Sequence, residues 1–127
     1  MTKGELEKYR TALEEKKAGI VASLKNREDI AIEKAADAID EVQLAGEREL
    51  AIRNLDRESH LLREVRAALA RIEDGSFGTC AHCDEEISPK RLKAVPWAPF
   101  CIRCQESADR HEFEAAEALD EFLADAA

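Results

Sequence analysis

Apolar residues recur at helical spacing along residues 3–74. Steps of three and four residues keep side chains on one face of a helix, so the pattern predicts long amphipathic helices. The first half of this stretch carries such a row, interrupted at Lys16 or Lys17, which consists of Leu6, Tyr9, Leu13, Ile20 and Leu24. We expect this row to be the packing face of a first long helix.

The second half of the stretch carries a seven-residue repeat. Leu55, Leu62 and Leu69 form the repeat, Val65 and Ile72 occupy the companion positions, and Glu58 breaks the companion row. Apolar seams of this kind are buried when they face each other or a partner chain. The pattern therefore predicts coiled-coil packing.

Two arrangements would bury these apolar rows: a hairpin within one chain, or one uninterrupted helix that pairs with a second chain. Both are possible because no glycine–proline cluster marks a turn. Asp37 and Asp40 are the best break signals, since a carboxylate can cap the first N–H groups of a new helix. Asp40 followed by Gln43 resembles a capping box, and Gly46 weakens the helix nearby. Folded back near residues 35–45, the chain forms a hairpin with arms roughly 45–50 Å long. An uninterrupted helix would be twice as long and would need a dimer partner; the pattern favours the hairpin.

A compact module follows the helical tract. Gly75 is the natural residue to end the second helix, so we divide the chain into a hairpin at residues 1–74 and a module at residues 75–127. Ser88 and Pro89 are typical of the N-cap and first position of a short helix. From about Ile102 onward an amphipathic terminal helix is expected, with an apolar face of Phe113, Ala116, Leu119 and Leu123.

Four cysteines lie in this module as two tight pairs. Cys80 and Cys83 are separated by two residues, as are Cys101 and Cys104, and 17 residues lie between the pairs. This spacing predicts one zinc ion held tetrahedrally, in preference to a thiol redox pair or unmetallated cysteines. Four thiolates leave no open coordination position, so the metal is expected to be structural. The sequence contains no nucleophile–base pair of the kind that would indicate an enzyme.

Basic residues gather around the second half of the module. Lys90, Arg91, Lys93 and Arg103 lie in a stretch with no acid from Ser88 to Cys104. They could balance the negative charge of the zinc–thiolate cluster, or they could form a small basic contact patch.

The charge and the composition of the chain argue against some classes of function. The chain has 28 acidic and 19 basic residues, a net charge of −9 and a pI near 4.9. A DNA reader needs a basic face to displace counterions from phosphates, so sequence-specific DNA binding is not expected. No run approaches the roughly 18 apolar residues of a membrane span, and the N-terminus lacks a signal-peptide core. We therefore expect a cytoplasmic protein.

The stretch from about Arg53 to Gln105 resembles the TraR/DksA family of zinc-finger transcription regulators. The motifs that carry the resemblance are Arg53-Asn54-Leu55-Asp56-Arg57-Glu58, Ile72-Glu73-Asp74-Gly75-Ser76-Phe77-Gly78-Thr79-Cys80, Arg91-Leu92, Pro96 and Cys101-Ile102 with Cys104. The resemblance implies a mainly α fold: a long antiparallel coiled-coil hairpin joined to a small C4 zinc-finger globular end with a C-terminal helix.

The resemblance also implies a function. Such proteins bind bacterial RNA polymerase as monomers and insert the hairpin into its secondary channel, which modulates initiation without sequence-specific DNA contact. The family's tip motif, Asp-x-x-Asp-x-Ala, falls on Asp37, Asp40 and Val42, with valine where alanine is usual. Arg53, Asn54 and Arg57 match residues that help the hairpin grip the channel rim. From the residues alone, these three would form a solvated helix face and the aspartates would be helix caps.

The family also includes partners of guanosine tetraphosphate, the alarmone of the stringent response. Members that cooperate with it supply basic residues to a shared pocket, and the equivalent positions here are Glu64, Val95 and Gln105. A polyphosphate needs cationic partners, so weak or absent synergy is expected.

Two other functions remain open at this stage. A Gre-like factor would use the acidic tip to stimulate transcript cleavage by polymerase. A structural coiled-coil and zinc adapter would dimerise through its apolar seams. Neither is excluded by the residues alone.

Overall fold

The computed structural model describes residues 1–36 and 41–111, and the side chains of residues 1–26 and 45–111. The predicted tip residues Asp37 and Asp40 lie outside the described residues. Val42 lies within a described helix, but its side chain is not described.

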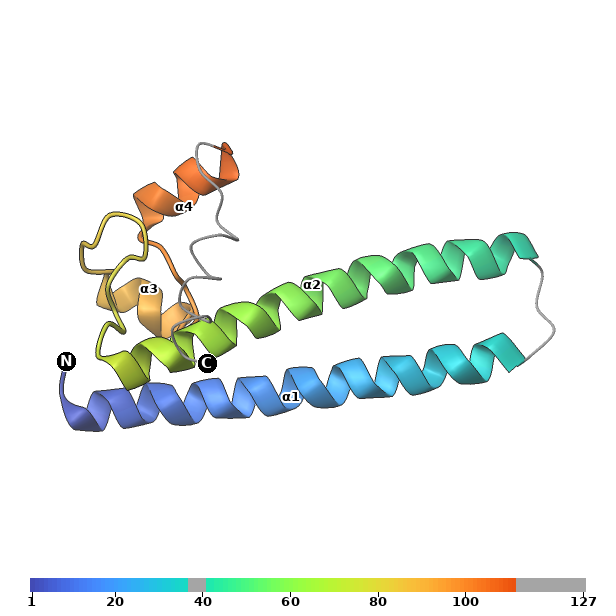
Figure 1. The fold of residues 1–127 in the computed structure, drawn as a ribbon, viewed down its shortest axis with the longest axis horizontal. Coiled ribbons are helices and arrows are strands. Elements are labelled where there is room, and N and C mark those ends of the chain that lie inside the picture. The colour runs from blue at the N-terminus through green and yellow to red at the C-terminus, as the bar shows by residue number, and fades with distance from the viewer. Residues whose placement is uncertain (37–40, 112–127) are drawn as a thin grey trace.

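Two long helices lie side by side and antiparallel (Figure 1). Helix α1 runs from Lys3 to Ala36 and α2 from Glu41 to Asp74, each with 34 residues. A capping box begins α1: Thr2 Oγ1 accepts from the Glu5 backbone N–H at 3.1 Å, and a Glu5 carboxylate oxygen accepts from the Thr2 N–H at 3.3 Å. The hairpin was the favoured of the two arrangements, and it is confirmed.

Helix α2 ends as the sequence predicts. Gly75 adopts a φ of 84°, and the N–H groups of Ser76 and Phe77 donate to the Arg71 carbonyl at 3.0 and 3.1 Å. This left-handed ending satisfies a carbonyl of the last helical turn, and a residue with a side chain would be strained at Gly75.

The zinc-finger end is built from loops and two short helices. Helix α3 runs from Pro89 to Ala94, and α4 from Ile102 to Asp109. Ser88 caps α3, because its Oγ accepts from the Arg91 N–H at 3.2 Å. Within residues 1–36 and 41–111 there is no strand, only an isolated antiparallel bridge between Thr79 and Glu86.

The expected terminal helix differs from the structure in one respect. Helix α4 begins at Ile102 but ends at Asp109, because the chain turns at Arg110 and His111, where φ reaches 59° at His111. The apolar positions predicted from Phe113 onward lie outside the described residues.

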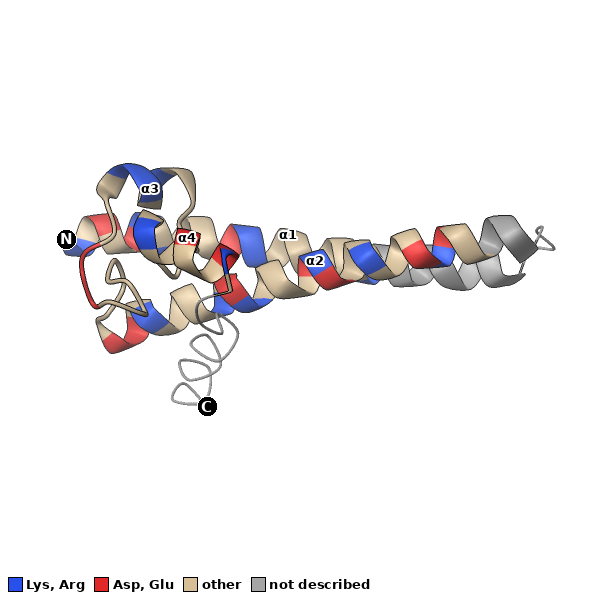
Figure 2. Cartoon of the chain, turned by 90° about the horizontal axis from the view of Figure 1, so that it is seen from above, with Lys and Arg blue, Asp and Glu red and all other residues tan. Residues whose placement is uncertain are grey.

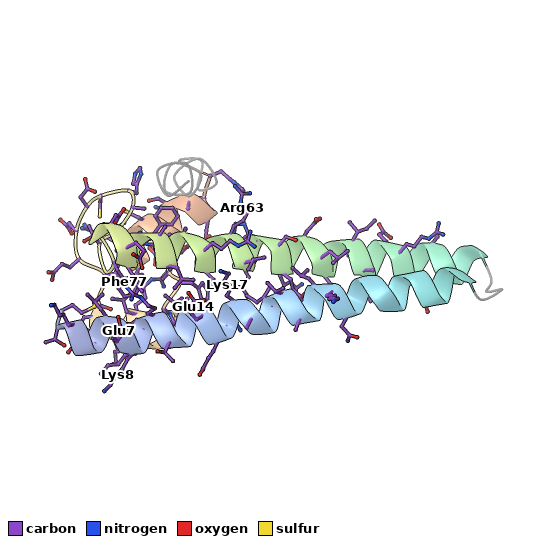
Figure 3. All side chains as sticks on the ribbon, turned by 60° about the horizontal axis from the view of Figure 1, so that its bottom comes forward. Glu7, Lys8, Glu14, Lys17, Arg63 and Phe77 are labelled. Atoms are coloured by element: carbon purple, nitrogen blue, oxygen red, sulfur yellow. The ribbon has the colours of Figure 1, made fainter. Side chains whose placement is uncertain are left out.

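One hydrophobic core joins the base of the hairpin to the zinc-finger end. The two predicted apolar rows meet in it, and the zinc-finger end adds aromatic and aliphatic side chains. Its buried members include Leu13, Ile20, Leu62, Val65, Ile72, Phe77, Leu92 and Phe100. Figure 3 shows Phe77 at the base of the hairpin, where its ring centroid lies 5.2 Å from that of Tyr9. Where Glu58 breaks the row, its carboxylate accepts from Ser23 Oγ at 3.2 Å, so a polar pair replaces the apolar contact.

The core thins along the arms away from the zinc-finger end. Leu50 and Ile52 of α2 are more than half exposed. None of the helices in the described part of the chain is long and apolar enough to cross a membrane.

Candidate metal centre

The four predicted cysteines come together in the structure. Their Sγ atoms all lie within 4.8 Å of one another, and the Sγ atoms of Cys83 and Cys101 are 3.8 Å apart. A tetrahedral zinc site with Zn–S bonds of about 2.3 Å has S–S edges of about 3.8 Å. The donor set therefore has the spacing that one zinc ion needs.

Backbone hydrogen bonds position the first cysteine pair. The Cys80 N–H donates to the Glu85 carbonyl at 2.8 Å, and the Asp84 N–H donates back to the Cys80 carbonyl at 3.1 Å. Asp84 adopts a φ of 61° in this turn, while Gly78 with a φ of 92° makes the bend that leads into it. The chain thus wraps around one edge of the site.

The second pair is positioned by helix α4. Cys101 is the N-cap of α4, and Cys104 lies in its first turn. The Ala81 N–H donates to the Pro99 carbonyl at 2.8 Å, which ties the two cysteine loops together. Both pairs are therefore held by backbone contacts.

The electrostatics of the thiols favour a bound cation. Burial opposes ionisation of Cys80, but N–H groups of Cys83, Cys101 and His82 stabilise its thiolate and lower its pKa to about 7. Burial raises the pKa of Cys104, and the neighbouring thiols add to this effect. Four thiolates at this spacing repel one another, and a divalent cation reverses that repulsion. The residues fit one structural Zn²⁺, which would hold the two loops together and leave no position for a substrate.

His82 is not part of the cluster. It lies between Cys80 and Cys83, is exposed, and is not among the residues whose ligand atoms converge. Four sulfurs complete a tetrahedral set, so a fifth ligand is not needed.

A buried arginine joins the zinc-finger end to α2. The Arg71 side chain is 1% exposed and its Nη2 donates to the Ala98 carbonyl at 3.3 Å. Burial lowers its pKa to about 10, against the opposing effect of Asp74 and Glu64, so it stays charged at neutral pH. Arg71 was not predicted from the sequence, because its only signal is a place beside Ile72 in a helix rich in exposed arginines.

A second contact joins the zinc-finger end to α1. Lys16 Nζ lies 5.2 Å from the centroid of the Trp97 ring, within range of a cation–π interaction. In the sequence, Lys16 was one of two residues that interrupt the apolar row. In the structure it contacts the zinc-finger end.

The predicted rim-contact residues lie on α2, away from the metal centre along the chain. Arg53 and Arg57 are exposed and Asn54 is half-buried. These positions leave both guanidinium groups accessible to a partner. Their role stays a prediction.

The three positions that the sequence predicts to be equivalent to the family's alarmone pocket also lie on described elements, and this equivalence stays a prediction. Glu64 accepts from His60 Nε2 at 3.0 Å, and burial raises its pKa despite the opposing effects of His60, Arg71 and Arg91. Val95 is the C-cap of α3, and the Gln105 amide donates to Asp109 at 3.0 Å.

Comparison with known proteins identifies the zinc-finger end. Residues 75–110 match the prokaryotic dksA/traR C4-type zinc finger. The RNA polymerase-binding transcription factor DksA of Escherichia coli K12 is 38% identical over 80 residues, which make up 63% of this chain and 53% of that protein. The Haemophilus influenzae protein of the same name is 38% identical over 80 residues, covering 63% of this chain and 55% of that protein. The chain spans about half the length of the curated relatives it matches.

Solved structures agree with the hairpin fold. Transcription factor DksA2 from Pseudomonas aeruginosa superimposes with a TM-score of 0.77 at 24% identity, over 88% of each chain. The RNA polymerase binding protein and transcriptional regulator Dks from Chlamydia trachomatis L2 superimposes with a TM-score of 0.60 at 24% identity, over 91% of this chain and 99% of that one. These likenesses concern the fold. Residues 75–110 therefore carry a C4-type zinc finger of the dksA/traR type, its four cysteines cluster as such a finger requires, and the chain is similar over 80 residues to DksA proteins.

Proposed function

We propose that this chain binds bacterial RNA polymerase and modulates transcription initiation by inserting its hairpin into the secondary channel. The observation that carries the proposal is the pair of antiparallel 34-residue helices that extend from a closed metal centre. Each arm reaches about 50 Å at the helical rise of 1.5 Å per residue, enough to enter a deep channel while the zinc-finger end stays outside. The sequence similarity to RNA polymerase-binding factors supports the choice of partner.

The chemistry of insertion would come from carboxylates. Residues 26–49, at the end of the hairpin far from the metal centre, contain eight acids and three bases. Asp37 and Asp40 would act on the catalytic magnesium or its basic surroundings, since carboxylates are preferred magnesium ligands and electrostatic partners of cations. Val42 is bulkier than alanine and would alter the fit of the tip.

Contacts along α2 would anchor the hairpin. Arg53 and Arg57 expose guanidinium groups that can bind carboxylates of the channel rim in a bidentate manner, and the half-buried Asn54 adds a polar contact. The protein would act as a monomer, because the rows that could pair with a second copy are buried between α1 and α2 at the base of the hairpin.

The proposed regulator is not an enzyme. A complete set of four thiolates would use the zinc for folding, and the effect on transcription would come from the position and charge of the tip. The channel is a protein cavity, so a chain with a net charge of −9 has no need to bind DNA.

Neutralising the tip should separate binding from regulation. We expect wild-type protein to co-purify with core polymerase and to change transcript yield in vitro. The Asp37→Asn/Asp40→Asn variant should bind with an affinity within about threefold of wild type, since the arms and zinc-finger end are unchanged, yet lose the transcriptional effect. Binding is measured by co-purification and titration, and regulation by multi-round transcription.

A charge-matched control keeps the tip intact. The Glu15→Gln/Glu106→Gln variant removes the same two charges at exposed positions on α1 and α4, and it should regulate like wild type. Failure of wild-type protein to bind polymerase would overturn the proposal. If the tip variant still regulates transcription, Asp37 and Asp40 do not have the proposed role.

Guanosine tetraphosphate should add little to the activity. Glu64 places a carboxylate where cooperating relatives need a cation, and Val95 and Gln105 supply no positive charge. A polyphosphate would meet repulsion at Glu64, so we expect less than a twofold change in transcript yield when the alarmone is added.

The matched variant is Glu64→Lys/Gln105→Lys, which adds cations at two of these positions. It should raise the response to guanosine tetraphosphate relative to wild type in the same transcription assay. A strong response of the wild-type protein would contradict the assignment of these positions.

A further inference from the structure

Helix α3 presents two lysines on one exposed face. Lys90 and Lys93 are both exposed and lie three residues apart, a spacing that places side chains on the same side of a helix. Leu92, 2% exposed, belongs to the hydrophobic core and fixes the opposite side. We call Lys90 and Lys93 the α3 lysine face.

These lysines have no ion-pair partner among the described residues. Other cations of the zinc-finger end are engaged: Arg91 Nε donates to the Phe100 carbonyl at 3.0 Å, and Arg103 pairs with Glu85 at 3.5 Å. Arg91 therefore lies against the loop that leads into Cys101. The two lysines extend into solvent, and they are not needed to hold the metal-binding loops.

Acids are absent from α3 and from the loop that follows it. In the described residues of the zinc-finger end, the acids lie in the first cysteine turn and in α4, and they are Asp84, Glu85, Glu86, Glu106 and Asp109. No acid occurs between Ser88 and Cys104. Figure 2 shows α3 at the edge of the molecule, with basic residues along it. A chain with 28 acids and 19 bases thus presents a locally basic surface on α3.

We propose that the α3 lysine face docks on a carboxylate-rich protein surface of RNA polymerase beside the channel opening. The proposal rests on the proposed function and names the kind of contact that the zinc-finger end makes there. The acids of residues 26–49 and the α3 lysine face are separated by about 50 Å of helix, so the two can meet different surfaces of one partner. Local cations of this kind are attracted to carboxylates, and this attraction speeds the productive encounter.

A carboxylate surface fits these observations better than nucleic acid does. Two lysines would release about two counterions from DNA, a salt slope of only about −1.8, which provides weak binding. The remaining charge of the chain is strongly negative and repels phosphates. A protein carboxylate surface needs only the local complementarity that α3 supplies.

Charge reversal on α3 tests the proposal. The Lys90→Glu/Lys93→Glu variant should bind core polymerase about tenfold more weakly than wild type at about 0.1 M salt, mainly through a slower association rate. Raising the salt should weaken wild-type binding and narrow the difference between the two proteins. Zinc content and far-ultraviolet circular dichroism should be unchanged, because both side chains are exposed.

The control reverses two lysines elsewhere on the surface. Lys3 and Lys8 are exposed on α1 at the base of the hairpin, and the Lys3→Glu/Lys8→Glu variant makes the same change in net charge. It should bind polymerase within about twofold of wild type. If both variants weaken binding equally, the effect is one of net charge and the proposed surface is wrong.

The outcomes separate this proposal from the proposed function. If wild-type protein binds polymerase and the α3 variant binds equally well, the lysine face is not a docking surface while the polymerase proposal stands. If wild-type protein does not bind polymerase at all, both are lost. Wild-type protein is also tested for binding to duplex DNA and for self-association in sedimentation. If either occurs and the α3 variant abolishes it, the lysine face serves a different partner.

Discussion

Loss of the metal should unfold the zinc-finger end and loosen the base of the hairpin, while the far half of the arms keeps its helical signal. We expect this result for Cys83→Ser as well as for chelation of the wild-type protein. Cys83 is exposed, so serine creates no cavity in the core and the change isolates the loss of one ligand. Structural zinc contributes about 10–16 kcal/mol of apparent binding free energy in small zinc fingers, which the module cannot replace from its own core.

The structure extends this prediction into the hairpin. Phe77, Leu92 and Phe100 of the zinc-finger end share one core with Leu13 and Val65 of the arms. Disorder of the module would therefore expose the base of α1 and α2. Hydrogen exchange should show lost protection in residues 9–20 and 62–74 but a small change near residue 50, where the side chains are already exposed.

The control is His82→Ala, which changes an exposed residue next to Cys83 that is not a predicted ligand. It should retain one zinc per chain by metal analysis, and added zinc should restore chelated wild-type protein. Full retention of zinc by Cys83→Ser would show that this cysteine is not a ligand. Equal loss of zinc in His82→Ala would show that the histidine belongs to the site.

Arg71→Ala should destabilise the fold by about 3 kcal/mol. The substitution removes a side chain that is 1% exposed, its hydrogen bond to the Ala98 carbonyl and the packing of its aliphatic stem. Hydrogen bonds to charged groups contribute about 1.5–3 kcal/mol, and the cavity adds to the loss. Arg71→Met restores most of the lost volume but carries no charge. Because burial of a guanidinium opposes folding, the methionine variant should lose less stability than the alanine variant.

Arg66→Ala is the matched control, because Arg66 is an exposed arginine on the same helix. Its effect on the free energy of unfolding should stay within about 0.5 kcal/mol. Both variants are compared with wild type by urea unfolding of the zinc-loaded protein. Equal stability of Arg71→Ala and Arg66→Ala would show that the buried arginine does not hold the two parts together.

Much of the local structure was predictable because it depends on neighbouring residues. The apolar rows predicted both arms, Gly75 predicted the end of α2, and Ser88 predicted the start of α3. The capping box of Thr2 and Glu5 is equally local, since the two residues are three positions apart, although it was not among the predictions. The end of α4 at Asp109 was missed, since apolar spacing continues past a turn that nothing in the pattern marks.

Other features depend on contacts between distant residues. Burial of Arg71 arises because Ala98 approaches α2 from 27 residues away, and a helix rich in arginine does not reveal which one is covered. The contact of Lys16 with Trp97 likewise requires α1 to lie beside the zinc-finger end. The sequence suggested a module separate from the hairpin, but only the structure shows the core that they share.

The cysteine spacing by itself determined the donor set of the metal centre, because two pairs separated by two residues each suit the edges of a tetrahedron. Helical periodicity by itself determined the arms, but it left open whether they pair within one chain or between two. Only the tertiary structure decided that question, since the same apolar seam is buried equally well in either arrangement. It also decided which charges are accessible: Arg71 is enclosed by packing, whereas the α3 lysines remain in solvent.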